Sequence, residues 1–391
     1  MTEEFFRSPD LVARARVNHG SDHCVITFDS YTDIRDLGRP GFGESFFNER
    51  RIDAIHILSR DNNWYQHPEI EALTKQIAAR TSSYRRVLAY GSSMGGYGSL
   101  RLGRVCGANV ALALSPQYSI DPNVVPFERR WLADAARIAA FPFEKDSRAF
   151  LPAETYIAFD PFDSDRRHVA LYAEEGSIIP IRAPFAGHPV TGFLAESGLL
   201  QPLVLDVLNG EADAKRFERL ARLKRKDTSQ YYYVLSNRIR SPQGKLVLAR
   251  RAARRSPENL VYLTNYATAL SIAGERALSE SQFRNCLALF PDNPVVLYQM
   301  SEMYERAGEL DAAVAQMRYL LSVHPDAPVY EARLRHLVTM LNLAKAQRSD
   351  ASIPMDVVSP TLSDGPDAID RHRLAQGRSM VARIRQALLK R

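Results

Sequence analysis

The chain has 391 residues, 45% of them hydrophobic and 25% charged, as in an ordinary globular protein with room for two or three domains. Its 51 basic and 45 acidic residues are intermixed and leave a formal net charge of only +6, which argues against nucleic-acid binding. Three cysteines without a CxxC pair argue against a disulfide framework or a zinc site. The sequence shows no pattern of a signal peptide or a membrane-spanning stretch, so we expect a cytoplasmic protein.

Short apolar segments alternate with helical patterns through the first half of the chain. Seven segments have the β-branched or alternating composition of strands, and they are 11–17, 23–28, 52–58, 86–90, 109–115, 155–160 and 178–184. The helical patterns between them lie near 68–80, 96–105, 127–140 and 165–174. Near-continuous apolar strands separated by helices predict an α/β domain over 1–200, with a mostly parallel sheet covered by helices on both faces.

The strand at 86–90 runs directly into a G-x-S-x-G pentapeptide centred on Ser93, in the sequence "RVLAYGSSMGGYGSL". A nucleophilic serine on a sharp strand-to-helix turn needs small neighbours on both sides, and a helix begins after it here. The backbone amide of Met94 would then face a developing oxyanion. The alternatives are an inert serine in a glycine-rich turn and a phosphate-binding loop, although the latter lacks its lysine.

A serine nucleophile needs a histidine base and a carboxylate partner. In the α/β-hydrolase superfamily, which the strand–serine–helix pattern resembles, these follow the serine in the order Ser, then Asp or Glu, then His. Asp160, Asp163 and Asp165 lie at the end of one later strand, and His188 lies in the loop after the next. The resemblance implies an acid about three residues beyond the last strand position, which favours Asp163, and Asp165 is expected to begin or cap a helix. We favour His188 over His168, which falls within that helix.

The order of Ser93, Asp163 and His188 resembles that of the α/β-hydrolase superfamily over the first 200 residues. The resemblance implies a Ser–His–Asp triad that needs no metal and no cofactor. A second oxyanion donor is expected just after the strand at 23–28, at Ser30 or Tyr31. Four residues in loops at the same sheet edge are candidates for the substrate pocket, although packing is an equal alternative for each: Trp64, Tyr65, Gln117 and Tyr118.

The segment between the strands at 109–115 and 155–160 is too short for a large lid, which favours a small or polar ester. We therefore expect an esterase or deacylase that acts on small or carbohydrate-linked esters. An acyltransferase that uses a sugar hydroxyl instead of water stays open. The stretches "FDSY", "NNWYQ" and "SPQ" are loosely similar to hydrolase-like proteins associated with bacterial glycan or secretion pathways.

A sequence repeat occupies the second half of the chain, which is helical in pattern from about residue 190. Pro257, Pro291 and Pro325 recur every 34 residues, and so do Gly274 and Gly308. Thirty-four residues is the period of the tetratricopeptide helix–turn–helix repeat. The glycines suit the turn within a helix pair, and the prolines follow the second helix.

Residues 226–345 resemble tetratricopeptide repeats, with good repeats at 260–293 and 294–327 and a degenerate unit before them. A capping helix is expected at 328–345, and a helical connection at 201–225 joins the repeats to the first domain. Such arrays present a groove for peptides or partner proteins, so the repeats are expected either to bind a protein or peptide partner or to pack on the catalytic domain. A non-catalytic scaffold with an inactive hydrolase-like core is the second class of function.

The C-terminal region has a different composition. Residues 346–368 are rich in Ser, Pro and Asp and predict a flexible linker. Residues 369–391 form a basic amphipathic pattern, which favours a helix that packs its apolar face on the repeats over one that binds a membrane surface.

Overall fold

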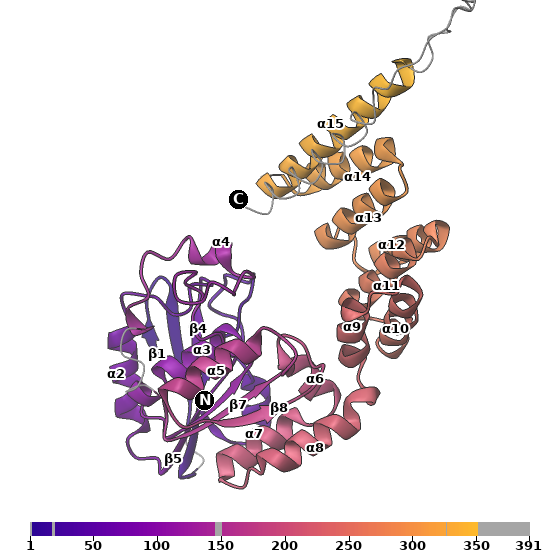
Figure 1. Cartoon of the computed structure of the whole chain (residues 1–391). Coiled ribbons are helices and arrows are strands. Elements are labelled where there is room, and N and C mark those ends of the chain that lie inside the picture. The colour runs from indigo at the N-terminus through magenta and orange to yellow at the C-terminus, as the bar shows by residue number, and fades with distance from the viewer. Residues whose placement is uncertain (1, 18–19, 145–150, 326, 351–391) are drawn as a thin grey trace, which may run out of the picture. The chain divides into compact units, whose positions relative to one another are not determined.

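An eight-stranded sheet forms the centre of the N-terminal part of the protein (Figure 1). The computed structural model describes residues 2–17, 20–144, 151–325 and 327–350. The strand order is β1-β2-β4-β3-β5-β6-β7-β8; β1 pairs antiparallel with β2 and β2 antiparallel with β4, and all other pairs are parallel. The strands are β1 (Glu3–Arg7), β2 (Leu11–Arg16), β3 (His23–Phe28), β4 (Asp53–Ser59), β5 (Arg86–Ser92), β6 (Val110–Leu114), β7 (Glu154–Phe159) and β8 (Ile179–Arg182).

The seven strands expected from the sequence are all present, and their ends differ from the expected ones by two residues or fewer. The additional strand is β1, at the edge of the sheet. Its sequence, EEFFR, has only two apolar residues, and none of its residues is fully buried. An edge strand with little buried surface leaves a weak hydrophobic pattern, which explains why the sequence did not predict it.

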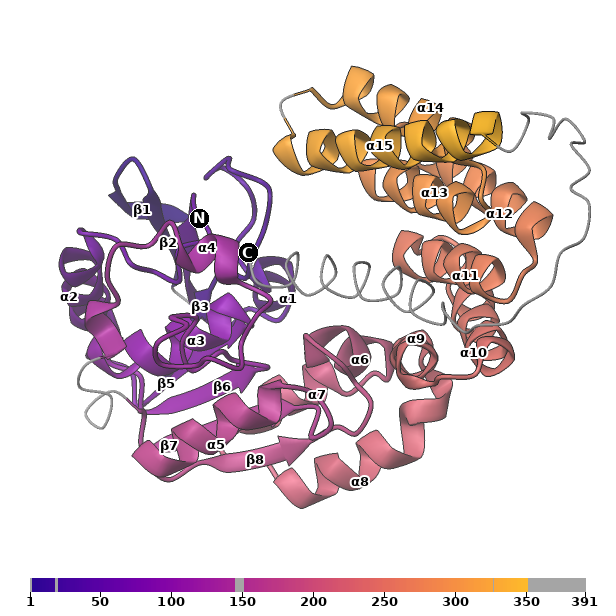
Figure 2. The same ribbon diagram turned by 45° about the horizontal axis from the view of Figure 1, so that its top comes forward.

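Helices cover both faces of the sheet, as Figures 1 and 2 show. Successive side chains of β3 alternate between the two faces, with Ile26 in one buried cluster and Val25 in the other. The first cluster includes side chains of α2 (Ile70–Thr81), α3 (Met94–Leu102) and α5 (Asp165–Glu175). The second includes side chains of α1 (Glu44–Glu49), α6 (Val190–Glu196), α7 (Leu200–Asn209) and α8 (Ala214–Lys224).

The expected helical segment 201–225 consists mainly of α7 and α8, and their apolar side chains pack on the sheet as part of the α/β layer. The helix expected at 127–140 is reduced to α4 (Leu132–Ala135). Just before α4, the side chains of Glu128 and Arg130 bind side chains of α5.

Paired helices make up the C-terminal half, as the repeat predicted. They are α9 (Ser229–Arg238), α10 (Pro242–Arg255), α11 (Leu260–Ile272), α12 (Arg276–Leu289), α13 (Pro294–Arg306), α14 (Leu310–Val323) and α15 (Pro328–Asp350). The starts of α11 and α13 are 34 residues apart, and so are those of α12 and α14. Asn259 and Asn293 cap α11 and α13 in the same way, and Gly274 and Gly308 have positive φ in the turns within each pair.

Helix α15 extends the predicted capping helix to Asp350, so the first residues of the predicted linker are helical. The rest of that linker and the predicted helix at 369–391 lie outside the described residues. Within the described part of the chain, no single helix is long and apolar enough to cross a membrane; α6 and α7 pass that test only as a pair, and they are bent by 101° relative to each other.

Candidate active site

Ser93 lies in a sharp turn between the end of β5 and the start of α3. Its backbone has φ 53° and ψ −115°, a strained conformation for a residue with a side chain and one that recurs at functional sites. The Ser93 amide donates to the carbonyl of Leu114 at 2.8 Å, which fixes the turn against the end of β6. The strand–serine–helix arrangement expected from the sequence is therefore present.

Two glycines flank Ser93 at positions where no side chain fits. A Cβ atom on Gly91 would lie 2.1 Å from the carbonyl oxygen of Gly95. One on Gly95 would lie 2.3 Å from the carbonyl oxygen of Phe28, at the end of β3. Both contacts involve backbone atoms, which cannot rotate away as a side chain can. The G-x-S-x-G spacing is a steric requirement of this turn.

His188 reaches the serine from the loop after β8. Its Nε2 atom lies 3.0 Å from the Oγ atom of Ser93. The loop is fixed just beyond the histidine, where the amide of Val190 donates to the hydroxyl of Ser115 at 3.0 Å. The peptide bond between His188 and Pro189 is cis. The two residues that the sequence paired as nucleophile and base are thus in hydrogen-bond contact.

The carboxylate that contacts His188 belongs to Asp165, the first residue of α5. Its Oδ2 and Oδ1 atoms lie 2.8 and 3.1 Å from Nδ1 of His188. Burial alone would raise the pKa of the Asp165 carboxyl, but the hydrogen bond with His188 and the charge of Arg130 hold that pKa below its ordinary value. The side chain is therefore a carboxylate at neutral pH. The prediction that Asp163 contacts His188 is wrong.

Asp163 lies on the outer side of the same loop. It is partly exposed, and its carboxylate is 3.6 Å from Arg130 and 3.4 Å from Arg238. A turn closed by the Asp163 amide and the Asp160 carbonyl, 3.1 Å apart, precedes α5. The turn ends at Asp163, and α5 begins at Asp165. Asp165, the first helical residue, is therefore the one that faces His188.

Asp160 fixes the loop that carries the histidine. Its carboxylate accepts backbone hydrogen bonds from Phe185 at 3.1 Å and from Gly187 at 3.0 Å. The side chain is fully buried, and burial raises the pKa of Asp160 despite these bonds. Of the three aspartates that the sequence placed after β7, Asp165 contacts the ring of His188, Asp160 binds the backbone of its loop, and Asp163 lies near two arginines.

Gln117 also contacts Ser93, and its own hydrogen bonds determine which group donates and which accepts in this site. The indole N–H of Trp64 donates to Oε1 of Gln117 at 3.2 Å, so the Nε2 group of Gln117 donates to Ser93 Oγ at 3.1 Å. With its oxygen accepting from Gln117, the Ser93 hydroxyl is oriented to donate to Nε2 of His188. His188 in turn has its proton on Nδ1, where it donates to Asp165.

A partly buried network of side chains binds Asp165 on the side away from His188. Arg130 donates to Asp165 at 2.9 Å and to Glu128 at 2.6 Å. Nε2 of His168 lies 2.9 Å from Glu128, and its Nδ1 accepts the amide of Tyr118 at 3.0 Å. Burial opposes ionisation of Glu128, but the bonds from His168 and Arg130 hold its pKa well below the ordinary value. His168 is thus a structural residue of α5.

The predicted oxyanion donors lie in backbone segments that meet at the turn. Met94 follows Ser93 as the first residue of α3. The hydroxyl of Ser30 donates to the carbonyl of Ser92 at 2.9 Å, so the loop after β3 lies against the turn. The ring of Tyr31 packs against Trp131, with 5.0 Å between centroids. The assignment of Met94 and of Ser30 or Tyr31 as donors stays a prediction.

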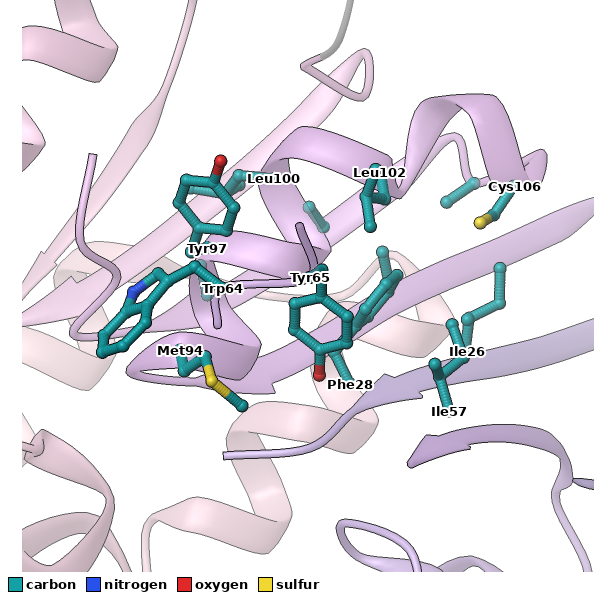
Figure 3. Packing of buried hydrophobic residues seen from close by; sticks show 14 of the residues in the cluster. Ile26, Phe28, Ile57, Trp64, Tyr65, Met94, Tyr97, Leu100, Leu102 and Cys106 are labelled. Carbon is teal, nitrogen blue, oxygen red and sulfur yellow. The ribbon is translucent and has the colours of Figure 1, made fainter. Parts of the chain in front are cut away.

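The four predicted pocket residues pack against or hydrogen-bond to other side chains of the core instead of facing an open cavity. Trp64 and Tyr65 are fully buried in the core cluster that Figure 3 shows. Tyr118 is partly buried and packs its ring on the guanidinium of Arg101, 4.5 Å away. Gln117 contacts the nucleophile itself. Aromatic and amide residues at a sheet edge give the same sequence signal whether they pack or bind, which is why the sequence could not separate the two.

A cavity of about 700 Å³ lies beside His188. It is formed by the residues before α4, the loop after β7, the His188 loop and α9. The lining residues are Arg130, Trp131, Phe162, Asp163, Ser164, Gly187, His188, Gln230, Tyr233, Val234, Asn237 and Arg238. Sequence reasoning missed the α9 residues because nothing local marks them. The described residues contain no group of three or more His, Cys, Asp or Glu side chains that could bind a metal ion.

The described chain is an α/β-hydrolase-like core with a serine at its strand-to-helix turn, followed by tetratricopeptide-like helices. No protein-family profile matches the sequence, and no curated protein sequence matches it. Among solved structures, the capsule O-acetyltransferase of Neisseria meningitidis serogroup A is similar over 52% of this chain and 93% of its own, with 14% identity and a TM-score of 0.40.

Two further solved structures are similar to different parts of the chain. A sugar hydrolase from Lactococcus lactis covers 57% of this chain and 100% of its own, with 11% identity and a TM-score of 0.37. A tetratricopeptide repeat protein from Thermus thermophilus covers 38% of this chain and 81% of its own, with 21% identity and a TM-score of 0.27. At these values the similarities carry no information on the substrate or reaction of this chain.

Proposed function

We propose that this protein is a serine-dependent enzyme that cleaves an ester through an acyl-enzyme intermediate on Ser93. The observation that carries the proposal is the directional series of hydrogen bonds from Ser93 through His188 to Asp165. A merely structural serine would not need a strained backbone, two enforced glycines and a base that is itself oriented by a buried carboxylate.

In the first step, Ser93 Oγ attacks the ester carbonyl carbon while its proton moves to Nε2 of His188. The carbonyl π electrons move to the oxygen, and the resulting anion would be stabilised by backbone N–H groups at the start of α3 and in the loop after β3. When the intermediate collapses, the bond to the leaving alcohol breaks and His188 returns its proton to that alcohol. Asp165 stabilises the imidazolium throughout.

The acyl-enzyme is resolved by a hydroxyl compound that binds in place of the leaving alcohol. The oxygen of that compound attacks the acyl carbon, its proton goes to His188, and the bond to Ser93 Oγ breaks with return of the proton to the serine. Water gives hydrolysis, and an alcohol gives acyl transfer. Acyl transfer is a second candidate because the cavity beside His188 is large enough for an alcohol co-substrate.

A fluorophosphonate probe and p-nitrophenyl acetate test the proposal. We expect the probe to label the wild-type protein and p-nitrophenyl acetate to be cleaved, and we expect Ser93→Ala and His188→Ala to abolish both. Product analysis in the presence of glycerol then measures the ratio of acetate to acetylglycerol, which separates hydrolysis from acyl transfer. Equal labelling of wild type and Ser93→Ala, or labelling of neither, would reject the proposed function. Peptide or protein binding by the repeats stays a separate prediction.

A further inference from the structure

One wall of the cavity beside His188 comes from α9, which belongs to the repeat half of the sequence. Helices α9 and α6 lie side by side (Figure 2), so the start of the repeat half adjoins the loop that carries the histidine. Tyr233, Asn237 and Arg238 of α9 line the cavity together with Trp131 and His188. The catalytic core alone therefore forms only part of this cavity.

Several contacts attach α9 to the His188 loop. The side-chain amide of Gln230 donates to the carbonyl of Ala186 at 3.0 Å. A Cβ atom on Gly187 would lie 2.6 Å from the side chain of Val234, and Gly187 has a φ of 71°. A glycine is thus needed both for the backbone conformation and for the close approach of the helix.

The C-terminal end of α9 is attached to the loop after β7. Arg238 donates to the carbonyl of Phe162 at 2.9 Å and to the carboxylate of Asp160 at 3.2 Å. Asp160 also binds the amides of the His188 loop. The wall of the cavity and the catalytic histidine are consequently positioned by the same buried carboxylate, so the cavity has a fixed geometry.

The chemistry of the lining is aromatic and amide rather than purely apolar. Trp131, Tyr233 and Phe162 offer ring surface, and Phe162 stacks on Phe185 with 4.7 Å between centroids. Asn237 is exposed and adds a group that both donates and accepts hydrogen bonds. Flat apolar surface beside hydrogen-bonding amides suits a ligand with an apolar ring face and several hydroxyl groups.

The charges of the lining do not favour an anion. Arg130 lies between Glu128 and Asp165, at 2.6 and 2.9 Å, and Arg238 is paired with Asp160. Asp163, which also lines the cavity, lies close to both arginines. Both cations are thus neutralised by protein carboxylates, and an anionic ligand would meet these carboxylates as well.

We propose that this cavity is the subsite for the alcohol portion of the substrate and that it binds a neutral sugar, with α9 as the wall that selects it. The inference rests on the proposed function, since it takes His188 as the group that exchanges a proton with the bound alcohol. The repeat half then takes part in substrate selection through its first helix.

Kinetics with two kinds of ester test the subsite. The substrates are the 6-O-monoacetates of glucose, galactose and mannose, which keep their other hydroxyl groups, and, for comparison, ethyl acetate, whose leaving alcohol is too small to place a ring on Tyr233. We expect Tyr233→Ala and Asn237→Leu to lower kcat/KM for at least one sugar acetate by about tenfold. Turnover of ethyl acetate and fluorophosphonate labelling should stay within about twofold of wild type, since these variants do not touch the reacting atoms.

Gln243→Leu is the matched control, because it replaces another exposed amide on the next helix, outside the cavity. It should leave both kinds of ester unaffected. The inference is overturned if the two cavity variants change sugar acetates and ethyl acetate by the same factor, or change neither.

Binding to the Ser93→Ala protein separates this inference from the proposed function. Titration calorimetry with glucose, galactose, mannose and N-acetylglucosamine needs no catalysis, and we expect at least one of them to bind and Asn237→Leu to weaken that binding. Tighter binding of glucuronic acid than of glucose, or no binding of any neutral sugar, overturns the inference. Absence of labelling in the wild type would reject the proposed function, and the calorimetry would still decide the subsite.

Discussion

Asp165 and Asp163 are separated by one residue, but only Asp165 faces the imidazole of His188. We expect Asp165→Asn to lower the rate of ester turnover by about a thousand- to ten-thousand-fold, because the amide no longer stabilises the imidazolium or the correct tautomer. Asp163→Asn removes only partly exposed ion pairs and should change turnover by less than about fivefold. Steady-state kinetics on both variants checks this, and a larger loss for Asp163→Asn would contradict the assignment.

Asp165 begins a helix, as expected. The conclusion that Asp163 rather than Asp165 contacts His188 did not follow from that. The first residue of a helix at the carboxyl edge of a sheet lies at that same edge, so Asp165 can begin α5 and still face a neighbouring loop. Spacing from the strand alone cannot choose between Asp163 and Asp165. The choice depends on the turn before α5 and on Arg130, which binds Asp165 from a distant segment.

Gln117 positions the Ser93 hydroxyl, and its removal should slow acylation. We expect Gln117→Met to lower the second-order rate of fluorophosphonate labelling by about tenfold or more, because the hydroxyl loses the donor that orients it toward His188. Trp64→Phe should act in the same direction by freeing the Gln117 amide to rotate.

Gln66→Met is the control, since Gln66 is a partly buried amide that is bonded to the Trp64 carbonyl and the Tyr97 hydroxyl and not to the Ser93 hydroxyl. It should lower stability without slowing labelling. Equal labelling rates for Gln117→Met and wild type, at unchanged thermal stability, would show that Gln117 has no part in positioning the serine.

At the scale of elements, the turn between β5 and α3 depends on Gly95. We expect Gly95→Ala to lower the free energy of unfolding by about 2–4 kcal/mol and to abolish labelling, since the added methyl group would overlap the backbone of β3. Gly192→Ala is the control, because its Cβ atom would meet its nearest neighbouring atom only at 3.9 Å, within α6. That variant should be as stable as wild type or more stable by up to about 1 kcal/mol.

Urea unfolding and labelling of the two alanine variants check this prediction. A Gly95→Ala protein with wild-type stability and labelling would mean that the turn can relax, and the steric account would be wrong.

The strands and the turn could be predicted from the sequence because local apolar composition and glycine spacing specify them. The shortening of the helix expected at 127–140 could not be predicted from the sequence. Glu128 and Arg130 form long-range ion pairs there that no local pattern reveals.

At the scale of the whole molecule, the repeat period predicted the helix pairs, but it gave no sign that α9 lines a cavity of the α/β core. A period arises from contacts between successive repeats, whereas the contacts of α9 with the His188 loop involve residues that do not recur. Gln230 and Arg238 look like ordinary polar positions of a degenerate repeat. Their importance depends on tertiary contacts, which a single sequence does not show.

A further contact joins the repeat half to the core through Tyr262 of α11. Its hydroxyl donates to Glu196 of α6 at 2.5 Å and lies 2.9 Å from Oε1 of Gln230, the residue that binds the His188 loop. Tyr262 is 4% exposed, although Glu196 is itself exposed, so removal of the hydroxyl takes away a partly buried hydrogen bond. We expect Tyr262→Phe to lower the free energy of unfolding by about 1–3 kcal/mol.

Tyr319→Phe removes a hydroxyl that also donates to a carboxylate, that of Asp292, but at an exposed site within the repeats. It should change stability by no more than about 0.5 kcal/mol, because water replaces the lost bond. Urea unfolding of both variants measures the difference, and hydrogen exchange should show faster exchange in α9 only for Tyr262→Phe. Equal losses of unfolding free energy in the two variants would mean that the Tyr262 contact contributes no more to stability than an exposed one. In that case α9 would not be a firmly attached wall of the cavity.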